Sequence, residues 1–338
     1  MKTRKALWVF LMFFSVLLPS YAVEAQNRCV DIVCENMQEA ANLPFVVSIS
    51  TAGPHGSGTG FVGEFGGKKY IVTNNHVVDA AIKVWVKRGK DSFWVETEKI
   101  SRDRAADVAL LSLPKEFENI PTAVLDERVA IGQQVYAIGD PFGMRSVTEG
   151  RITATDVWIL QMYILTQTPL NPGNSGGPMI NGDKKVVGIA TAIISGANNV
   201  AFALPVQYLV KLFPRLVAEK IVRHATTDFM YFNASSVPPL FFEAQGLEYP
   251  PTQNRILVLS QSQNPNVDIR PGDTILKMND SVITDAWTLE REIFFRYKPG
   301  EEVELTLMRN GQSLKRKIIL SEFVIQYAPR EGKGKEKE

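Results

Sequence analysis

The sequence predicts a mainly β protein whose larger domain is a β barrel or sandwich and whose smaller domain is of the α+β type. From residue 44 to about residue 204, short apolar runs rich in β-branched residues alternate with Gly, Asn, Asp and Pro, a pattern typical of all-β folds. The 338 residues exceed the roughly 100–200 residues of one domain, which favours two domains. With 45% hydrophobic and 22% charged residues, the chain can bury real cores.

The larger domain is predicted to be built from short strands followed by one helix. The clearest strands are the runs 45–49, 70–73, 83–86, 108–111 and 186–190. A helix is predicted over 205–222, where apolar residues recur at spacings of three and four. Pro205 suits its first turn, whereas Pro214 is expected to interrupt or kink it.

The smaller domain is predicted from a change of pattern after residue 226. A polar, aromatic and proline-bearing stretch to residue 251 precedes a regular series of elements. These are strands at 256–259, 274–278, 303–309 and 314–320, a helix at 286–295 and a turn at Asn310-Gly311. Four strands and one helix of this size form a separate small domain.

The first 25 residues read as a signal peptide. Three basic residues precede an uncharged apolar run from residue 6 to residue 18, and small residues suit cleavage after Ala25 or, as the alternative, after Ala22. An uncleaved anchor is the other interpretation, but the run is short against the roughly 20 residues of a membrane span. We therefore expect export to the periplasm or the medium.

The two cysteines, Cys29 and Cys34, lie just after the predicted cleavage site. Export to an oxidising compartment favours their pairing, which would close a small loop and order the N-terminal segment 26–43. The sequence around them has no histidine and no small, apolar lipoprotein cleavage site. We predict no thiol chemistry, no metal site and no lipid anchor there.

The overall charge argues against nucleic acid or an anionic membrane as a partner. With 37 basic and 36 acidic side chains the formal net charge is +1, so no long-range field attracts either. The three histidines share no metal-ligand spacing. The sequence accordingly predicts neither a metal nor another cofactor.

Three short segments carry candidate catalytic residues: 71–78 with His76, 106–111 with Asp107, and 171–178 with Ser175. A serine hydroxyl needs a histidine to take its proton and a carboxylate to orient that histidine. The order His, Asp, Ser is one of the known orders of such a triad. Glycines around Ser175 allow a tight turn in which the amides of Gly173 and Ser175 form an oxyanion hole.

The loop 173–177 also fits the G-x-S-x-G pattern of α/β-hydrolases. That fold requires a helix directly after the serine and an acid and a histidine downstream. Here Gly-Gly-Pro and a strand-like run follow, and His224 is the sole later histidine, so we reject this alternative. His55 and His224 are interpreted as ordinary polar residues, in a glycine-rich turn and in a linker.

These segments resemble the HtrA (Deg) family of trypsin-like serine proteases over residues 40 to 322. The matches are 56–61, 73–78, 107–111, 138–143, 171–178 and 201–205, with 270–276 and 278–280 in the smaller domain. The resemblance implies two six-stranded β-barrels with the triad in the cleft between them, a homotrimer, and one C-terminal PDZ domain that binds peptide. It also implies substrates that are unfolded or misfolded proteins, cut without ATP.

The predicted organisation follows from these observations. It comprises a signal peptide (1–25), an N-terminal segment (26–43), a protease domain (44–215), a linker that begins the PDZ-like domain (216–255), the PDZ-like core (256–322) and a disordered charged tail (323–338).

The chain departs from the family pattern at three places. Asp140 replaces the usual asparagine, and Gln167 replaces the usual aspartate before the serine loop. The family's carboxylate-binding loop is expected near 223–232, but 225–229 contains no glycine. Without that glycine the backbone amides are not expected to converge on a peptide carboxylate.

Ala190, Thr191 and Ala192 resemble the family's pocket wall, and together with Pro169 this resemblance implies a small apolar specificity pocket. Pro169 stands where enzymes that cut after Lys or Arg carry an acid, so we expect cleavage after small aliphatic residues such as Val or Ala. The leading hypothesis is thus an extracytoplasmic quality-control endopeptidase, and a narrow signalling protease would differ only in its client range. A non-catalytic chaperone or scaffold that binds unfolded chains stays open as the rival.

Overall fold

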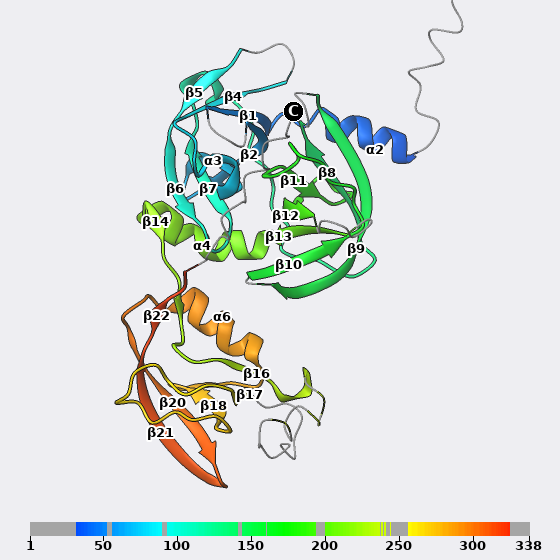
Figure 1. The fold of residues 1–338 in the computed structure, drawn as a ribbon. Coiled ribbons are helices and arrows are strands. Elements are labelled where there is room, and N and C mark those ends of the chain that lie inside the picture. Colours follow the sequence, from blue (N-terminus) through cyan, green and yellow to red (C-terminus); the bar gives the residue numbers. More distant parts are fainter. Residues whose placement is uncertain are drawn as a thin grey trace, which may run out of the picture.

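The computed structural model describes residues 32–52, 56–89, 93–140, 144–159, 161–193, 200–236, 238, 240, 244 and 256–324. These residues form two β-rich halves that lie side by side and a smaller unit beneath them (Figure 1). The mainly β architecture with a small α+β unit at the C-terminal side confirms the predicted fold class.

The first half is a curled sheet of eight strands in the order β14-β6-β7-β3-β2-β1-β4-β5. Its strands are β1 (Val46–Ala52), β2 (Ser57–Phe65), β3 (Lys68–Thr73), β4 (Lys83–Lys87), β5 (Val95–Thr97), β6 (Lys99–Asp103), β7 (Val108–Ser112) and β14 (Ile221–Val222). All neighbours are antiparallel except β14 and β6. The family resemblance predicted six strands here, and the sheet has eight because β14 arrives from the linker and β5 extends the other edge.

The second half is a closed six-stranded barrel in the order β10-β13-β12-β11-β8-β9, as predicted. Its strands are β8 (Gln134–Gly139), β9 (Ser146–Ile159), β10 (Gln161–Thr166), β11 (Pro178–Ile180), β12 (Val186–Ile193) and β13 (Ala201–Pro205). Buried apolar side chains fill its interior, among them Val135, Ile152 and Ile164. Closure of the barrel pairs every strand on both sides and leaves no open edge.

Short helices join and cover the two halves. They are α2 (Ile32–Ala41), α3 (Asn75–Val78), the 3-10 turn η2 (Lys115–Phe117) and α4 (Val206–Ala218). Helix α2, which the sequence did not predict, packs on β8 and β9, and α4 contacts strands of both halves. Helix α4 ends at Ala218 rather than 222, since the chain turns extended at Glu219 and enters β14. Pro205 caps its start, and Pro214 lies inside it.

The smaller unit contains the strands and the helix predicted for it. Its sheet runs β16-β17-β18-β20-β21 with β19 paired to β18, and β15 pairs with β22. The elements are β15 (Ala225–Thr226), β16 (Tyr231–Asn233), η4 (Ala234–Ser236), β17 (Ile256–Val258), β18 (Thr274–Met278), β19 (Ser281–Val282), α6 (Ala286–Arg296), β20 (Glu302–Arg309), β21 (Gln312–Ile319) and β22 (Ser321–Glu322). Asn310 and Gly311 both have positive φ, as a tight hairpin turn requires.

Two parts of the predicted linker and tail are structured. Strands β15 and β16 lie within the segment that the sequence assigned to the linker and the start of the small domain. The Phe323 amide donates to the His224 carbonyl oxygen at 2.8 Å, so ordered structure continues past the predicted domain end. Sequence patterns missed these strands because two or three residues are too few to establish a period.

His224 is not an ordinary linker residue, which corrects the prediction. Its side chain is fully buried against the equally buried Asp103, with Nε2 2.6 Å from Asp103 Oδ2. Its Nδ1 is 3.0 Å from the Phe294 carbonyl oxygen, and its ring stacks on the Phe294 ring with centroids 3.5 Å apart. Since Asp103 belongs to β6 and Phe294 to α6, His224 joins the small unit to the first sheet.

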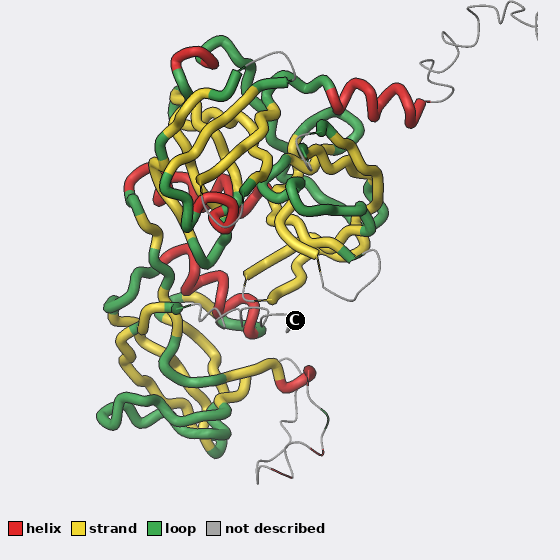
Figure 2. Tube along the Cα trace, turned by 45° about the horizontal axis from the view of Figure 1, so that its top comes forward, coloured by secondary structure: helices red, strands yellow, loops and turns green. Residues whose placement is uncertain are grey.

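Further contacts support this joint. Helix α6 lies on the side of the small unit that faces the two β-rich halves (Figure 2), and the Phe295 ring meets Tyr208 of α4 at 4.9 Å between centroids. Lys298 Nζ is 3.0 Å from Glu219 Oε1. The joint therefore combines aromatic packing, strand pairing through β14, the buried contact between His224 and Asp103, and one ion pair.

Several predictions fall outside the described residues: the signal peptide, Cys29 and hence its pairing with Cys34, His55, and the tail from residue 325. Among the helices that the structure describes, none has the length and apolar character needed to cross a bilayer.

Replacing His224 with Ala should destabilise the protein by about 3–5 kcal/mol, because Asp103 then stays buried without its partner. Urea unfolding of the full chain measures this. The control is Arg296→Ala, which removes an exposed ion pair with Glu292 and should cost less than about 1 kcal/mol. Equal losses in the two variants would contradict the importance of the joint.

Candidate active site

Asp107 occupies an unusual backbone conformation at the end of a turn between β6 and β7, with φ of 54°. Positive φ costs a non-glycine residue of order 1–3 kcal/mol unless surrounding contacts impose it. Its carbonyl oxygen accepts from Asn74 Nδ2 at 2.8 Å and from the Asn75 amide at 3.1 Å. Its carboxylate accepts from the His76 amide at 2.8 Å. The segment before and at His76 therefore fixes both ends of Asp107.

His76 lies on the short helix α3 that directly follows β3. Its Nδ1 is 2.7 Å from Asp107 Oδ2, and the Asp107 side chain is only 14% exposed. The acceptor-only carboxylate places the proton on Nδ1, which makes Nε2 the nitrogen that can exchange a proton with a hydroxyl. The structure thus brings His76 and Asp107 together as predicted.

The Ser175 loop packs against the strand end that leads to His76. The Thr59 amide donates to the Ser175 carbonyl oxygen at 2.9 Å. Gly176, with φ of +84°, lies so close that a Cβ there would stand 2.1 Å from Thr73 Oγ1 and 2.9 Å from the Asn74 amide nitrogen. Only glycine fits this approach, and the approach brings the serine loop onto the segment that carries His76.

The Ser175 hydroxyl donates to the Thr191 carbonyl oxygen of β12 at 3.3 Å. The Thr191 hydroxyl accepts from Asn74 Nδ2 at 3.3 Å. The Gly176 amide donates to the Ala190 carbonyl oxygen at 2.8 Å. Two of the four predicted pocket residues, Ala190 and Thr191, therefore touch the serine loop.

The other two predicted pocket residues are less clearly placed. Ala192 follows in β12, but its side chain is outside the described set. Pro169 is exposed, and its carbonyl oxygen accepts from the Thr148 hydroxyl at 2.7 Å. A contribution of either side chain to a specificity pocket stays a prediction.

The predicted oxyanion residues lie in a tight turn whose conformation is held from outside. Gly173 has φ of +105°, and its carbonyl oxygen accepts from Thr59 Oγ1 at 2.7 Å. Within the described residues, the amides of Gly173 and Ser175 donate to no acceptor. The role of these two amides as paired donors to an oxyanion stays a prediction.

A buried ion pair supports the same turn. The Thr59 hydroxyl that holds Gly173 accepts from the Asp140 amide at 2.9 Å. The Asp140 carboxylate is buried and bonds to Arg145 Nε at 2.9 Å and to the Ser48 hydroxyl. The departure from the family pattern at residue 140 therefore coincides with a local ion pair two hydrogen bonds away from Gly173.

Sequence reasoning missed three contributors to the site: Thr59, Asn74 and Arg145. Asn74 offered a signal, because an amide at the end of an apolar strand must find buried partners. Thr59 and Arg145 offered no such signal. Their partners, Gly173 and Asp140, lie 114 and 5 residues away, and no sequence motif links either pair. Gln167, the other departure, has an exposed side chain and donates its amide to the Arg151 carbonyl oxygen at 3.1 Å.

Two domain families match the chain. Residues 58–189 match the family described as trypsin-like peptidase domain, and residues 245–320 match the PDZ domain. The first range contains His76, Asp107 and Ser175, and the second contains helix α6. The chain therefore combines a trypsin-like peptidase domain with one PDZ domain.

Curated relatives narrow this class. A probable periplasmic serine endoprotease DegP-like of Halomonas elongata is 31% identical over 269 residues, 75% of this chain and 54% of that protein. A protein of the same description from Ectopseudomonas mendocina is 32% identical, with 78% and 56% covered. The chain belongs to the HtrA (Deg) family of trypsin-like serine proteases, with a single PDZ domain. It spans about half the length of these relatives.

Solved structures share the fold. The HtrA-type protease AlgW, solved with a tripeptide, superposes with a TM-score of 0.71 at 24% identity, covering 85% of this chain and 98% of that one. A serine endoprotease from Yersinia pestis gives 0.65 at 24% identity with the same shares. At this identity the likeness concerns the fold.

Thr59→Val should lower the free energy of unfolding by about 2–3 kcal/mol, since the Asp140 amide and the Gly173 carbonyl would both lose a buried partner. Valine keeps the shape, so the loss reports the hydrogen bonds. Chemical denaturation measures it against Thr148→Val, whose hydroxyl serves an exposed contact. A loss no larger than the control's would show that Thr59 does not hold this turn.

Proposed function

We propose that the protein is an exported, ATP-independent serine endopeptidase of HtrA type that hydrolyses unfolded or misfolded proteins. The observation that carries the proposal is the 2.7 Å contact between His76 Nδ1 and Asp107 Oδ2 beside a serine loop packed on the same strand end. An imidazole oriented by a carboxylate is the base that a serine nucleophile requires.

In the proposed reaction the Ser175 oxygen attacks the carbonyl carbon of a peptide bond. His76 Nε2 takes the hydroxyl proton, and the Asp107 carboxylate stabilises the resulting imidazolium through Nδ1–H. The C–N bond then breaks, and the imidazolium gives its proton to the leaving amine. Water hydrolyses the acyl-enzyme by the same steps, with His76 again acting as base.

The amides of Gly173 and Ser175 are the proposed donors to the tetrahedral oxyanion. Removal of one such donor typically costs about 100- to 1000-fold in rate. The Thr59 hydroxyl donates to the Gly173 carbonyl oxygen. Its proposed contribution is therefore to orient the Gly173 amide and not to contact substrate.

Location, assembly and domain limits are part of the proposal. Relatives described as periplasmic endoproteases support export through the predicted signal peptide 1–25. We retain the homotrimer, the protease domain 44–215 and the PDZ-like domain that begins in 216–255 and has its core at 256–322 as parts of this proposal.

Ser175→Ala should reduce casein hydrolysis by about a millionfold or to background, because the nucleophile is gone. A fluorophosphonate probe should label Ser175 in the unaltered protein and leave the variant unlabelled. Ser313→Ala, which changes an exposed serine of β21, is the control and should retain both activities. Casein cleavage by Ser175→Ala would refute the triad. Absence of labelling and hydrolysis in the unaltered protein would favour the non-catalytic chaperone.

Cleavage is expected after small aliphatic residues. Ala190 and Thr191 beside the serine loop are small, and a pocket without a buried charge does not compensate the desolvation of a Lys or Arg side chain. Mass spectrometry of the fragments of a denatured protein measures the preference. A majority of cuts after Lys, Arg or large aromatic residues would contradict it.

A further inference from the structure

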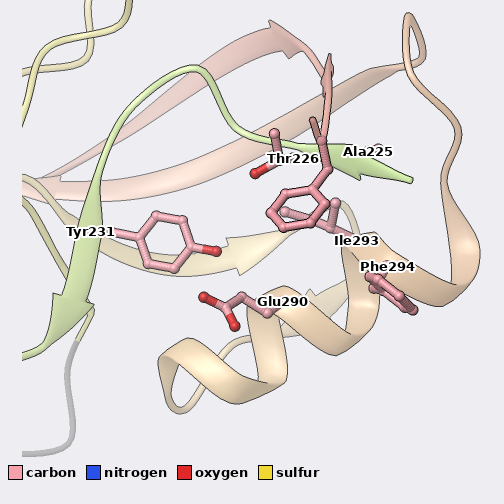
Figure 3. Close-up of a pocket in the computed structure, with 7 residues that line it drawn as sticks. Ala225, Thr226, Tyr231, Glu290, Ile293 and Phe294 are labelled. Carbon is pink, nitrogen blue, oxygen red and sulfur yellow. The ribbon is translucent and has the colours of Figure 1, made fainter. Parts of the chain in front are cut away.

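The small unit contains a pocket of about 190 Å³ between β15, β16, helix α6 and the last described residues (Figure 3). Its lining is apolar or aromatic apart from Thr226, the Tyr231 hydroxyl and one carboxylate. The residues are Ala225, Thr226, Tyr231, Glu290, Ile293, Phe294 and Phe323. A pocket with apolar walls and one acidic group suits a ligand that has an apolar part and one polar group able to pair with the carboxylate.

Glu290 places this carboxylate on the inner face of α6. Ile293 and Phe294 follow at spacings of three and four and so share that face. The Tyr231 hydroxyl of β16 points toward the carboxylate (Figure 3). The second oxygen, Oε2, is buried and has no partner among the described residues. A buried oxygen without a donor is rare in proteins and marks a place for one.

The charge around Glu290 is uncompensated. Burial raises the pKa of Glu290 to about 7, and the neighbouring Tyr231 opposes the shift. The same burial and the neighbouring Glu290 raise the pKa of Tyr231 well above its ordinary value. No basic side chain forms an ion pair with Glu290 in the described part of the chain. A cation entering the pocket would compensate the negative charge of Glu290, whereas a carboxylate entering it would add a second negative charge.

The loop beside the pocket is also unsuited to a carboxylate. It carries an acid of its own, Asp228, whose Oδ2 accepts from the Ser262 hydroxyl at 2.7 Å and from the Asn264 amide at 3.1 Å. The Met230 amide already donates to Ser260 Oγ at 2.9 Å. The loop is therefore tied to the neighbouring segment 260–264 by its own polar groups.

We propose that this pocket binds the side chain of an internal lysine in an extended polypeptide. The four-carbon stem lies along Phe323 and Ile293, and the ammonium reaches the unpartnered oxygen of Glu290. A single available oxygen suits a point charge, whereas a guanidinium prefers two oxygens side by side. Strand β16 is at the edge of its sheet, so the bound main chain can add beside it. The inference does not depend on proteolysis.

The test uses the full chain carrying Ser175→Ala, so that peptides are not cut. Fluorescence anisotropy follows labelled acetyl-Val-Val-Lys-Val-Val-amide and its counterparts with norleucine, acetyl-lysine or arginine at the centre. We expect the lysine peptide to bind about 10- to 100-fold more tightly than the norleucine and acetyl-lysine peptides. Equal affinities would overturn the proposal, and so would tighter binding of a norleucine peptide that ends in a free carboxylate.

The pH dependence of peptide binding provides a second test on the same protein. Between pH 6 and pH 8 Glu290 gains its charge while the lysine keeps its own, so the dissociation constant of the lysine peptide should fall. Tyr231 is the other titratable group in the lining, and it stays neutral in this range. The norleucine peptide should not respond. A lysine preference that does not grow with pH would count against the assignment, even if a variant at position 290 fails to fold.

Glu290→Gln removes the charge and keeps the shape, and it should abolish the lysine preference. Glu292→Gln is the matched control: this neighbour bonds to Ser281 and Arg296 and is not part of the pocket lining. A preference that persists in Glu290→Gln would refute the proposal. A chain ending at Val324 tests the protein's own lysines. Binding seen only after removal of residues 325–338 would assign the pocket to that tail and overturn the external peptide.

Discussion

The structure of the site depends on the backbone of Asp107. This residue has a positive φ, and its carbonyl oxygen accepts from Asn74 and Asn75. Its carboxylate bonds to both the backbone amide and the Nδ1 of His76. Four hydrogen bonds compensate a conformation that costs of order 1–3 kcal/mol alone. The constraint acts both ways: it fixes the imidazole and anchors the start of α3, so His76 and Asp107 form one folded unit.

The serine loop is a second unit, and Thr59 joins it to the rest. One hydroxyl serves the Gly173 carbonyl and the Asp140 amide at once. The conformation of the turn at Gly173 therefore depends on the first sheet, through β2, and on the closed barrel, through the residue after β8. Such a shared residue joins the two halves, because His76 follows β3 of the first sheet and Ser175 precedes β11 of the closed barrel.

The sequence was sufficient for the fold class, for the strands with clear alternation and for the two-domain order. Short motifs also singled out His76, Asp107 and Ser175. The structure joins the first two and packs the serine loop on the same strand end, while their catalytic roles stay a prediction. The sequence was not sufficient where a role arises from distant pairing. His224 looked like a linker residue, since nothing near it in sequence indicates Asp103, 121 residues away. Strands β15 and β16 are too short to show a period.

Asp103 takes part in two separate contacts, one beside the candidate site and one with the small unit. Its Oδ1 accepts from the Ala106 amide, inside the turn that ends at Asp107, and its Oδ2 meets His224. During divergence of the family, a change at this position would have to satisfy the turn that ends at Asp107 and a domain contact together. Residues 103 and 224 should therefore vary as a pair among close relatives, and a gene fusion that exchanges only the PDZ half would inherit half of that pair.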